Sequence, residues 1–278
     1  MPLYQAVILA LVQAVTEFLP ISSTAHLFLF PWLLGWNDPG LDYTVVVHAG
    51  TLIGVILYFL KTWLELGLAG LGIRYPAGAA PEEIRTNRKL FWYIVAGTAP
   101  AALAGVLLEK HIETTFRSPV LMGSMLILVG VVMWVAEQRS QLARGMQSLT
   151  LGDALLIGTA QAIALVPGVS RSGITIVAGL VRGMTREAAA RFTFLLATPI
   201  IAGASAVKLW QMRQNALGDE TAAALVAGFL VSAVAGYAVI ALLLRYLQTR
   251  TLRIFIYYRI AFGIVILLLV FLQVGSAR

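Results

Sequence analysis

The sequence predicts an all-α polytopic membrane protein, with six transmembrane helices and two re-entrant helical hairpins in an inverted-topology repeat. Three observations predict this fold class. Hydrophobic residues make up 59% of the 278 residues and charged residues only 12%, against roughly 25% charged residues in a soluble domain. Six apolar stretches approach the length of about 20 residues that crosses a bilayer. Two further apolar regions are interrupted by polar residues. The composition excludes a nucleic-acid-binding domain and predicts a single integral membrane domain over 1–278.

The first interrupted region runs from Leu3 to Leu34 and breaks at Pro20, where the sequence reads PISST. Irregular backbone at membrane depth is tolerated only where protein buries it or where it lines a wet cavity. We therefore expect a half-helix, a break and a second half-helix that returns to the same side. A single span kinked at the proline is the alternative.

The predicted spans of the first half follow this hairpin at 43–60, 90–108 and 119–136. The segment 61–89 contains Pro76, Pro81 and many charged residues, and it is predicted to be a solvated loop. The second half begins with another interrupted region, Leu151 to Val181, which breaks at Pro167-Gly168. Its predicted spans are 192–210, 222–244 and 254–273.

The two halves resemble each other at a nearly constant offset. Gln13 corresponds to Gln161 and Ser22 to Ser170, each pair 148 residues apart. We infer a duplication with repeats of approximately 1–136 and 149–278. Three crossings in each half invert the second repeat relative to the first, which is the plan of many transporters. The tips of the two hairpins then meet near the midplane.

Lysine and arginine residues orient the chain. Most of them, including Arg85, Arg144 and Arg182, fall in loops on one side of the predicted spans. The positive-inside rule makes that side cytoplasmic. Both termini then face outward, and the first hairpin enters from outside. Cysteine is absent, so disulfides are excluded.

Ionisable groups inside a membrane are costly and usually functional. Gln13 and Glu17 are four residues apart and share a helix face, as do Ser22 and His26. Ser22 and Ser23 stand where a helix N-cap belongs. We expect Glu17 and His26 to act together in activating a hydroxyl. The alternative is that the serines only cap the helix and that His26 bonds a neighbouring helix.

Arg171 stands at the predicted start of a half-helix, where backbone N–H groups and the positive end of the helix dipole favour an anion. Gly168 and Gly173 would allow a ligand close to the backbone. An ion pair between Arg171 and Glu17 with a structural role is the alternative. The two hairpin tips together suit phosphoryl transfer to a serine or to water. A hydrogen bond to a neighbouring helix is expected for His48, and snorkelling to the cytoplasmic surface for Arg259.

The stretch QAVTEFLPISSTAH (residues 13–26) and the stretch PGVSRSGITI (residues 167–176) resemble two motifs of the bacitracin-resistance family of undecaprenyl-diphosphate phosphatases. The resemblance covers essentially the whole chain. It implies hydrolysis of undecaprenyl diphosphate to undecaprenyl phosphate and inorganic phosphate, which recycles the lipid carrier for cell-wall synthesis and confers bacitracin resistance. It implies a multi-pass protein of the bacterial inner (plasma) membrane, and we expect its active site to face outward.

The resemblance also implies roles for residues. The catalytic residues are Glu17, Ser23 as nucleophile, His26 and Arg171. The phosphate-binding residues are Ser22, Thr24, Ser170, Arg171, Ser172 and Gly173. The supporting residues are Gln13, Gln161 and Thr175. A divalent cation, Mg²⁺ or Ca²⁺, is implied with Glu17 as a ligand. Many members have glutamate where this chain has Gln13, so the cation is expected to be held mainly by the substrate diphosphate. The expected partners are the polyprenyl diphosphate and membrane lipids but no nucleic acid, and a homodimer is left open.

Three other functions could use parts of this pattern. A lipid or solute transporter could use the same architecture, but transport of an anion needs the arginine and no nucleophile. An intramembrane serine protease would use Ser170 with His26 or His48, and an arginine directly after the nucleophile suits phosphate better than a peptide. The other lipid-phosphatase superfamily needs an Arg-Pro dipeptide, which the sequence lacks.

Overall fold

The computed structural model describes residues 1–73, 79–115, 118–212 and 219–276, and the chain folds into α-helices there. A short 3₁₀ turn at Met146–Ser148 precedes the seventh of them. The helices in chain order are α1 (Leu3–Phe18), α2 (Ser23–Leu34), α3 (Gly40–Tyr58), α4 (Leu60–Leu71), α5 (Pro81–Thr115), α6 (Pro119–Arg139), α7 (Leu151–Ile163), α8 (Arg171–Val181), α9 (Arg186–Met212), α10 (Asp219–Leu247) and α11 (Arg253–Ser276).

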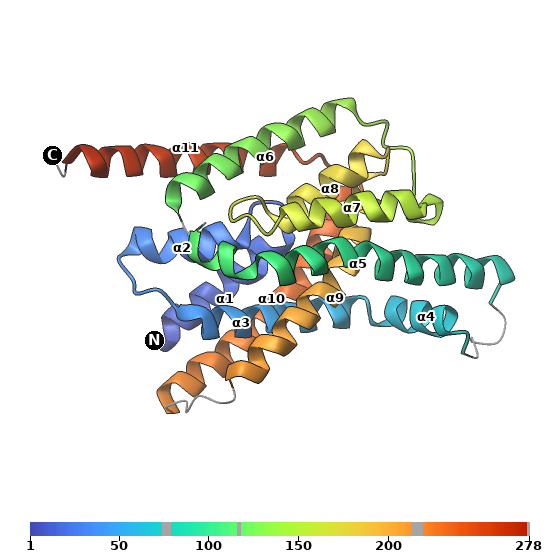
Figure 1. Cartoon of the computed structure of the whole chain (residues 1–278), viewed down its shortest axis with the longest axis horizontal. Helices are drawn as coiled ribbons and strands as arrows, with labels where there is room; N and C mark the ends of the chain where they lie inside the picture. Colours follow the sequence, from blue (N-terminus) through green and yellow to red (C-terminus); the bar gives the residue numbers. More distant parts are fainter. Residues whose placement is uncertain (74–78, 116–117, 213–218, 277–278) are drawn as a thin grey trace.

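Six of the described helices, α3, α5, α6, α9, α10 and α11, are long and apolar enough to cross a membrane. They coincide with the six predicted spans, which confirms the prediction of a polytopic all-α protein. α3 packs against α10 and α9, and α6 packs against α11. The chain begins, and α11 ends, at the same end of the bundle (Figure 1).

The prediction of a solvated loop over 61–89 is wrong for most of its length. α4 occupies Leu60–Leu71 and α5 already begins at Pro81. Pro81, followed by Glu82 and Glu83, makes a favourable start for α5. Proline has no N–H group, and the N–H groups of the first helical turn have no partner within the helix in any case. The two carboxylates interact favourably with the positive end of the helix dipole. Lys61 and Glu65 add an i,i+4 ion pair of 3.7 Å on α4. Pro76 lies outside the described residues.

The two interrupted regions form hairpins of short helices, α1 with α2 and α7 with α8. α1 has 16 residues, so it is about 24 Å long and too short for a hydrocarbon core of about 30 Å. The hairpins come from opposite ends of the bundle and their loops meet in its interior (Figure 1). The Ser172 hydroxyl donates to the Leu19 carbonyl across this meeting point, at 3.1 Å. An inverted repeat requires the two hairpins to enter from opposite ends, as they do here. Membrane re-entry and the duplication remain predictions.

Close backbone packing holds the second hairpin against α5. A Cβ atom added at Gly158 of α7 would lie 2.0 Å from the carbonyl oxygen of Gly97 on α5. Only a residue without a side chain allows this approach, which is a common way for helices to associate in membranes. The position of α7, and with it the loop that follows, therefore depends on this contact.

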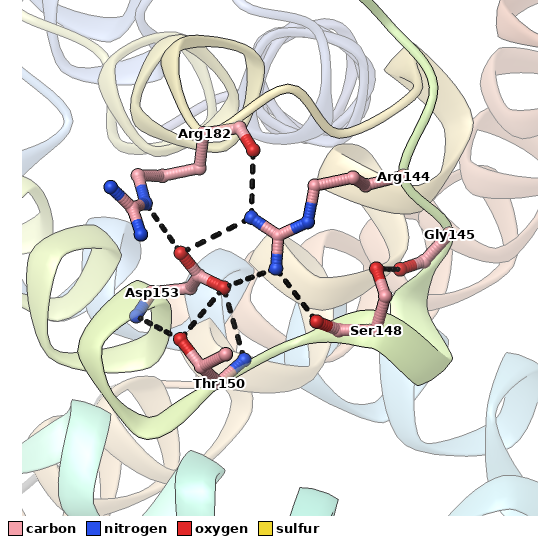
Figure 2. Close-up of polar contacts among 6 residues, drawn as sticks. All are labelled: Arg144, Gly145, Ser148, Thr150, Asp153 and Arg182. Atoms are coloured by element: carbon pink, nitrogen blue, oxygen red, sulfur yellow. Dashed lines mark hydrogen bonds and ion pairs between the residues drawn. The ribbon is translucent and has the colours of Figure 1, made fainter.

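A charged clasp, formed by Asp153, Arg144 and Arg182, joins the ends of the α7–α8 hairpin that lie away from its loop (Figure 2). Asp153, fully buried near the start of α7, accepts from Arg144 at 2.7 Å and pairs with Arg182 just after α8. The carboxylate also accepts from the backbone N–H of Thr150, whose hydroxyl in turn accepts from the Asp153 N–H, so the two form a capping box. Burial raises the pKa of the Asp153 carboxyl, but the hydrogen bonds from Arg144 and Arg182 outweigh this and hold the pKa well below its usual range. The carboxylate therefore stays charged at neutral pH and ties both ends of the hairpin together.

Replacing Asp153 with asparagine is expected to destabilise the protein by about 1–3 kcal/mol, because a buried partner of two arginines is removed. The thermal unfolding midpoint in detergent should fall by several degrees. The matched control is Glu82→Gln, since the side chains of Glu82 and Arg85 are 79% and 70% exposed and such a pair contributes little. Equal midpoints for the two variants would contradict a structural role for the clasp.

Candidate active site

The N-termini of α2 and α8 meet where the two hairpin loops meet. Their N-cap residues, Ser22 and Ser170, have φ values of 77° and 73°. Non-glycine residues rarely adopt positive φ, and such strain is concentrated at functional sites. The backbone therefore takes the same unusual turn before both helices and aims two positive helix ends at one region.

A small cavity of about 30 Å³ lies between these helix ends, about the volume that one water molecule takes up in the liquid. Both hairpins line it, and all five lining residues from the first are polar. The lining residues are Thr16, Glu17, Ser22, Ser23 and Thr24 from the first hairpin and Ala164, Val166, Gly168, Ser170 and Arg171 from the second.

Glu17 is the centre of the polar contacts on the first hairpin. Its Oε2 accepts from the Ser23 hydroxyl at 2.6 Å and from the Gln13 amide at 3.1 Å. The side chain is buried, at 8% exposure, because it lies on the face of α1 that turns toward α2. A carboxylate at this distance can take the proton of the Ser23 hydroxyl. The expected convergence of Gln13, Glu17 and Ser23 is confirmed.

His26 does not join this group, and the expected pairing of Glu17 with His26 is not formed. The His26 Nδ1 lies 2.7 Å from the Ser22 carbonyl, and Nε2 lies 2.7 Å from the Tyr258 hydroxyl. A carbonyl can only accept, so Nδ1 carries a proton. The ring also stacks on Phe262 of α11, at 4.7 Å between centroids. The i,i+4 spacing does place His26 beneath the loop, but the same geometry turns its ring toward α11 and away from the cavity.

His48 takes the place beside Glu17 that was expected for His26. Its Nε2 lies 3.4 Å from Glu17 Oε2, and its Nδ1 lies 2.8 Å from the Thr44 carbonyl one turn earlier on α3. The expected contact with a neighbouring helix is present, since Glu17 lies on α1, and the partner is the carboxylate that lines the cavity. An ionisable residue within an apolar span was the signal in the sequence that could have found it.

Arg171 stands opposite Glu17 at the start of α8 and lines the same cavity. The two charged groups do not pair with each other, so the alternative of a structural ion pair is wrong. Within the described chain, the buried Nη1 atom of Arg171 has no hydrogen-bond partner. A buried donor atom without a hydrogen-bond partner is costly unless a ligand completes it. Its fork of donors suits the oxygens of a phosphate group.

The other expected phosphate-binding groups divide between several roles. Ser22, Thr24 and Ser170 line the cavity, and Ser170 also accepts from the Gly173 N–H at 3.2 Å. Ser172 borders a second cavity and donates to the first hairpin. A Cβ at Gly173 would lie 2.8 Å from Nη1 of Arg259, so Arg259, and not a ligand, takes up the space that the missing side chain leaves.

The two remaining supporting residues lie behind the site. Thr175 donates to the Arg171 carbonyl at 2.7 Å and accepts from Thr193 of α9 at 3.0 Å, which fixes the first turn of α8. Gln161 is buried on α7 and lines neither cavity, and its amide atoms have no partner in the described part of the chain.

The residues around the cavity offer only part of a metal site. The described residues contain no group of three His, Cys, Asp or Glu side chains that could hold an ion. Glu17 supplies one carboxylate, and the buried Gln13 Oε1 has no partner among the described residues. Mg²⁺ and Ca²⁺ prefer such oxygens but need about six ligands. The donor set therefore fits a cation held jointly with a ligand's own oxygens.

A second, smaller and mainly apolar cavity adjoins the first and shares Glu17 and Arg171 with it. It lies between α3 and α9. Its apolar lining consists of Phe18, Val55, Phe194, Ala197 and Ile201. A ligand with a charged head and an apolar tail could therefore contact the lining residues of both cavities at once.

Comparison with known proteins shows the family of the chain. The model of the family described as bacitracin resistance protein BacA matches residues 6–265. An undecaprenyl-diphosphatase of Moorella thermoacetica is 44% identical over 98% of this chain and 100% of its own length. The undecaprenyl-diphosphatase of Pelotomaculum thermopropionicum is 42% identical over 97% of each chain, and that of Elusimicrobium minutum is 45% identical over 95% of this chain and 96% of its own. The family match and these nearly full-length identities place the chain in the bacitracin resistance protein BacA family.

Proposed function

We propose that this protein is an integral membrane phosphatase that hydrolyses undecaprenyl diphosphate to undecaprenyl phosphate and inorganic phosphate. The observation that carries the proposal is the 2.6 Å contact of Ser23 with Glu17 on a cavity that Arg171 also lines. A base, a nucleophile and an anion-binding group then surround one space. A transporter of an anionic lipid would need Arg171 but would have no use for a carboxylate placed on a serine hydroxyl.

In the proposed reaction the terminal phosphate lies between the start of α2 and the start of α8. Arg171 and the N–H groups of both helix ends bind its oxygens and offset charge in the transition state. Ser23 Oγ attacks the terminal phosphorus while Glu17 takes the hydroxyl proton. The O–P bond forms, the bond from phosphorus to the bridging oxygen breaks, and the polyprenyl monophosphate leaves.

Water completes the cycle by attacking the phosphoserine. The bond from phosphorus to Ser23 Oγ breaks, Glu17 returns its proton to the serine, and inorganic phosphate is released. A bound divalent cation would neutralise charge on the diphosphate, with Glu17 and Gln13 as its protein ligands. His48 holds the carboxylate of Glu17 in place, and His26 fixes the start of α2 through the Ser22 carbonyl.

The polyprenyl chain enters the apolar cavity between α3 and α9 and leaves sideways into lipid. The substrate therefore lies in the membrane, and its hydrolysis recycles a lipid carrier for cell-wall synthesis. Removing the diphosphate form of this lipid is also the basis of bacitracin resistance. The homodimer remains a prediction.

The experiment that tests the function is release of inorganic phosphate from undecaprenyl diphosphate by the purified protein in detergent, with and without Mg²⁺ or Ca²⁺. Phosphate release that saturates with the lipid supports the proposal. Absence of release under both conditions, from protein that elutes as a single folded species, refutes it. Comparison of the two conditions tests the cation.

We also propose that the protein lies in the bacterial inner (plasma) membrane with its active site open to the outside, because basic residues gather on the opposite side of the spans. The absence of cysteine makes a direct test simple. In intact cells, a membrane-impermeant maleimide should label a cysteine introduced at Ser118, in the loop between α5 and α6. It should not label one at Ser140, which follows α6. The reverse pattern would invert the orientation.

A further inference from the structure

Arg259 is the largest fully buried side chain of the described chain, at 0% exposure. The sequence predicts snorkelling from near a helix end, and that prediction is wrong. Arg259 lies in the second turn of α11 and its side chain runs inward, past α6, to the two hairpin loops. Neither the proposed chemistry nor the packing of apolar helices requires a charge at this place, where burying one is expensive.

The contacts of Arg259 explain how the charge is tolerated. Nη1 donates to the Pro20 carbonyl of the first hairpin loop at 3.0 Å. Nη2 donates to the Gly168 and Val169 carbonyls of the second loop at 3.1 Å and 3.0 Å. Nε donates to the Leu126 carbonyl of α6 at 2.9 Å. No carboxylate is among its partners in the described residues, so backbone carbonyls, with the Met133 sulfur at 3.4 Å from Nη1, offset the charge.

The three loop carbonyls lie directly before the active groups. Pro20 precedes Ser22 and Ser23, and Gly168 and Val169 precede Ser170 and Arg171. The guanidinium group is planar and its donors have a fixed geometry. One side chain therefore sets the distance between the two loops, and α6 holds that side chain through Leu126.

We propose that Arg259 is a positioning residue, whose fork of donors joins the two hairpin loops and thereby holds Ser23 and Glu17 opposite Arg171. The inference rests on the proposed phosphatase function. Displacement of a reacting group by about 1 Å can cost about 10²-fold in rate. Loss of the fork should therefore lower kcat in protein that is still folded.

The test compares Arg259→Lys, Arg259→Gln and Arg259→Met with Ile266→Ala. Ile266 is equally buried on α11 and belongs to an apolar cluster with Met122 and Leu126 of α6 and Ala25 and Leu29 of α2, and none of these residues lies in either loop. We expect Ile266→Ala to lower the thermal midpoint and to keep the wild-type kcat when assayed well below that midpoint. The three Arg259 variants should lose about 10- to 10²-fold in kcat, with a smaller change in KM. Arg259→Lys should not keep the wild-type kcat, because an ammonium group is a point charge without the planar fork of donors of a guanidinium group.

A second measurement follows the distance between the two hairpins and does not depend on enzyme activity. Because the chain has no cysteine, spin labels can be attached at Leu33→Cys on α2 and Val181→Cys on α8, which are 43% and 65% exposed. Double electron–electron resonance should give a narrow distance distribution in the wild-type and Ile266→Ala backgrounds and a broader one with Arg259→Lys or Arg259→Met.

Several outcomes would overturn the inference. Full kcat with a narrow distribution in Arg259→Lys would show that charge alone suffices. Wild-type kcat in Arg259→Gln and Arg259→Met would show that no link is needed. Failure of all three Arg259 variants to fold, while Ile266→Ala folds, would make Arg259 a folding residue. An inactive wild-type protein would instead refute the phosphatase function itself.

Discussion

Substituting alanine for Arg171 is expected to lower kcat/KM for phosphate release by about 10³-fold or more, in the range measured for arginines that stabilise phosphoryl transfer. Arg171 faces the cavity with an unused, buried Nη1 donor, so a phosphate oxygen would complete its hydrogen bonding. Charge on the phosphoryl oxygens is offset mainly by such prearranged groups. The measurement is steady-state release of phosphate from undecaprenyl diphosphate in detergent.

Two further variants make this result specific. Arg171→Lys keeps the positive charge but loses the bidentate fork, so its activity should fall between those of wild type and Arg171→Ala. Arg85→Gln removes a charge of the same kind from an exposed position, at 70% exposure of the side chain, and should leave activity unchanged. Activity of Arg171→Ala within a few-fold of wild type would remove the arginine from the mechanism.

The local part of the site could be predicted from the sequence. A proline-interrupted apolar stretch predicts a helix break, and the spacing from Gln13 to Glu17 predicts a shared face. Ser23 follows the break closely enough to reach back to Glu17. These relations involve residues within one hairpin, where helical periodicity and chain connectivity alone decide which groups can meet.

The partners contributed by other helices could not be predicted in this way. His48 reaches Glu17 from α3, Tyr258 reaches His26 from α11, and Arg259 reaches both loops from 239 residues beyond Pro20 along the chain. Each contact depends on how a whole helix is rotated about its axis. A membrane helix is apolar on its lipid face and on its packed face, so hydrophobic periodicity gives little information about that rotation. This is why the sequence pairs His26 with Glu17 and places Arg259 at the membrane surface.

Replacing Glu17 with glutamine is expected to lower kcat by about 10²- to 10⁴-fold with little change in KM, as loss of a general base does. Glutamine has nearly the same shape and can still accept from the Ser23 hydroxyl, but it cannot take the proton. Ser23→Ala removes the group that Glu17 acts on and should cost a similar factor. The measurement is kcat and KM for both variants, with folding checked by elution as a single species.

The double variant Glu17→Gln/Ser23→Ala decides between two mechanisms. If Glu17 acts only by deprotonating Ser23, the second substitution adds almost nothing, because groups that act as a unit show strongly non-additive effects. The 2.6 Å contact between them favours this result. If water is the nucleophile and Ser23 only positions it, Glu17 remains useful without the serine, and the two losses should multiply. Multiplicative losses, with Ser23→Ala keeping most of its activity, would make Glu17 the base for water and would exclude a phosphoserine intermediate.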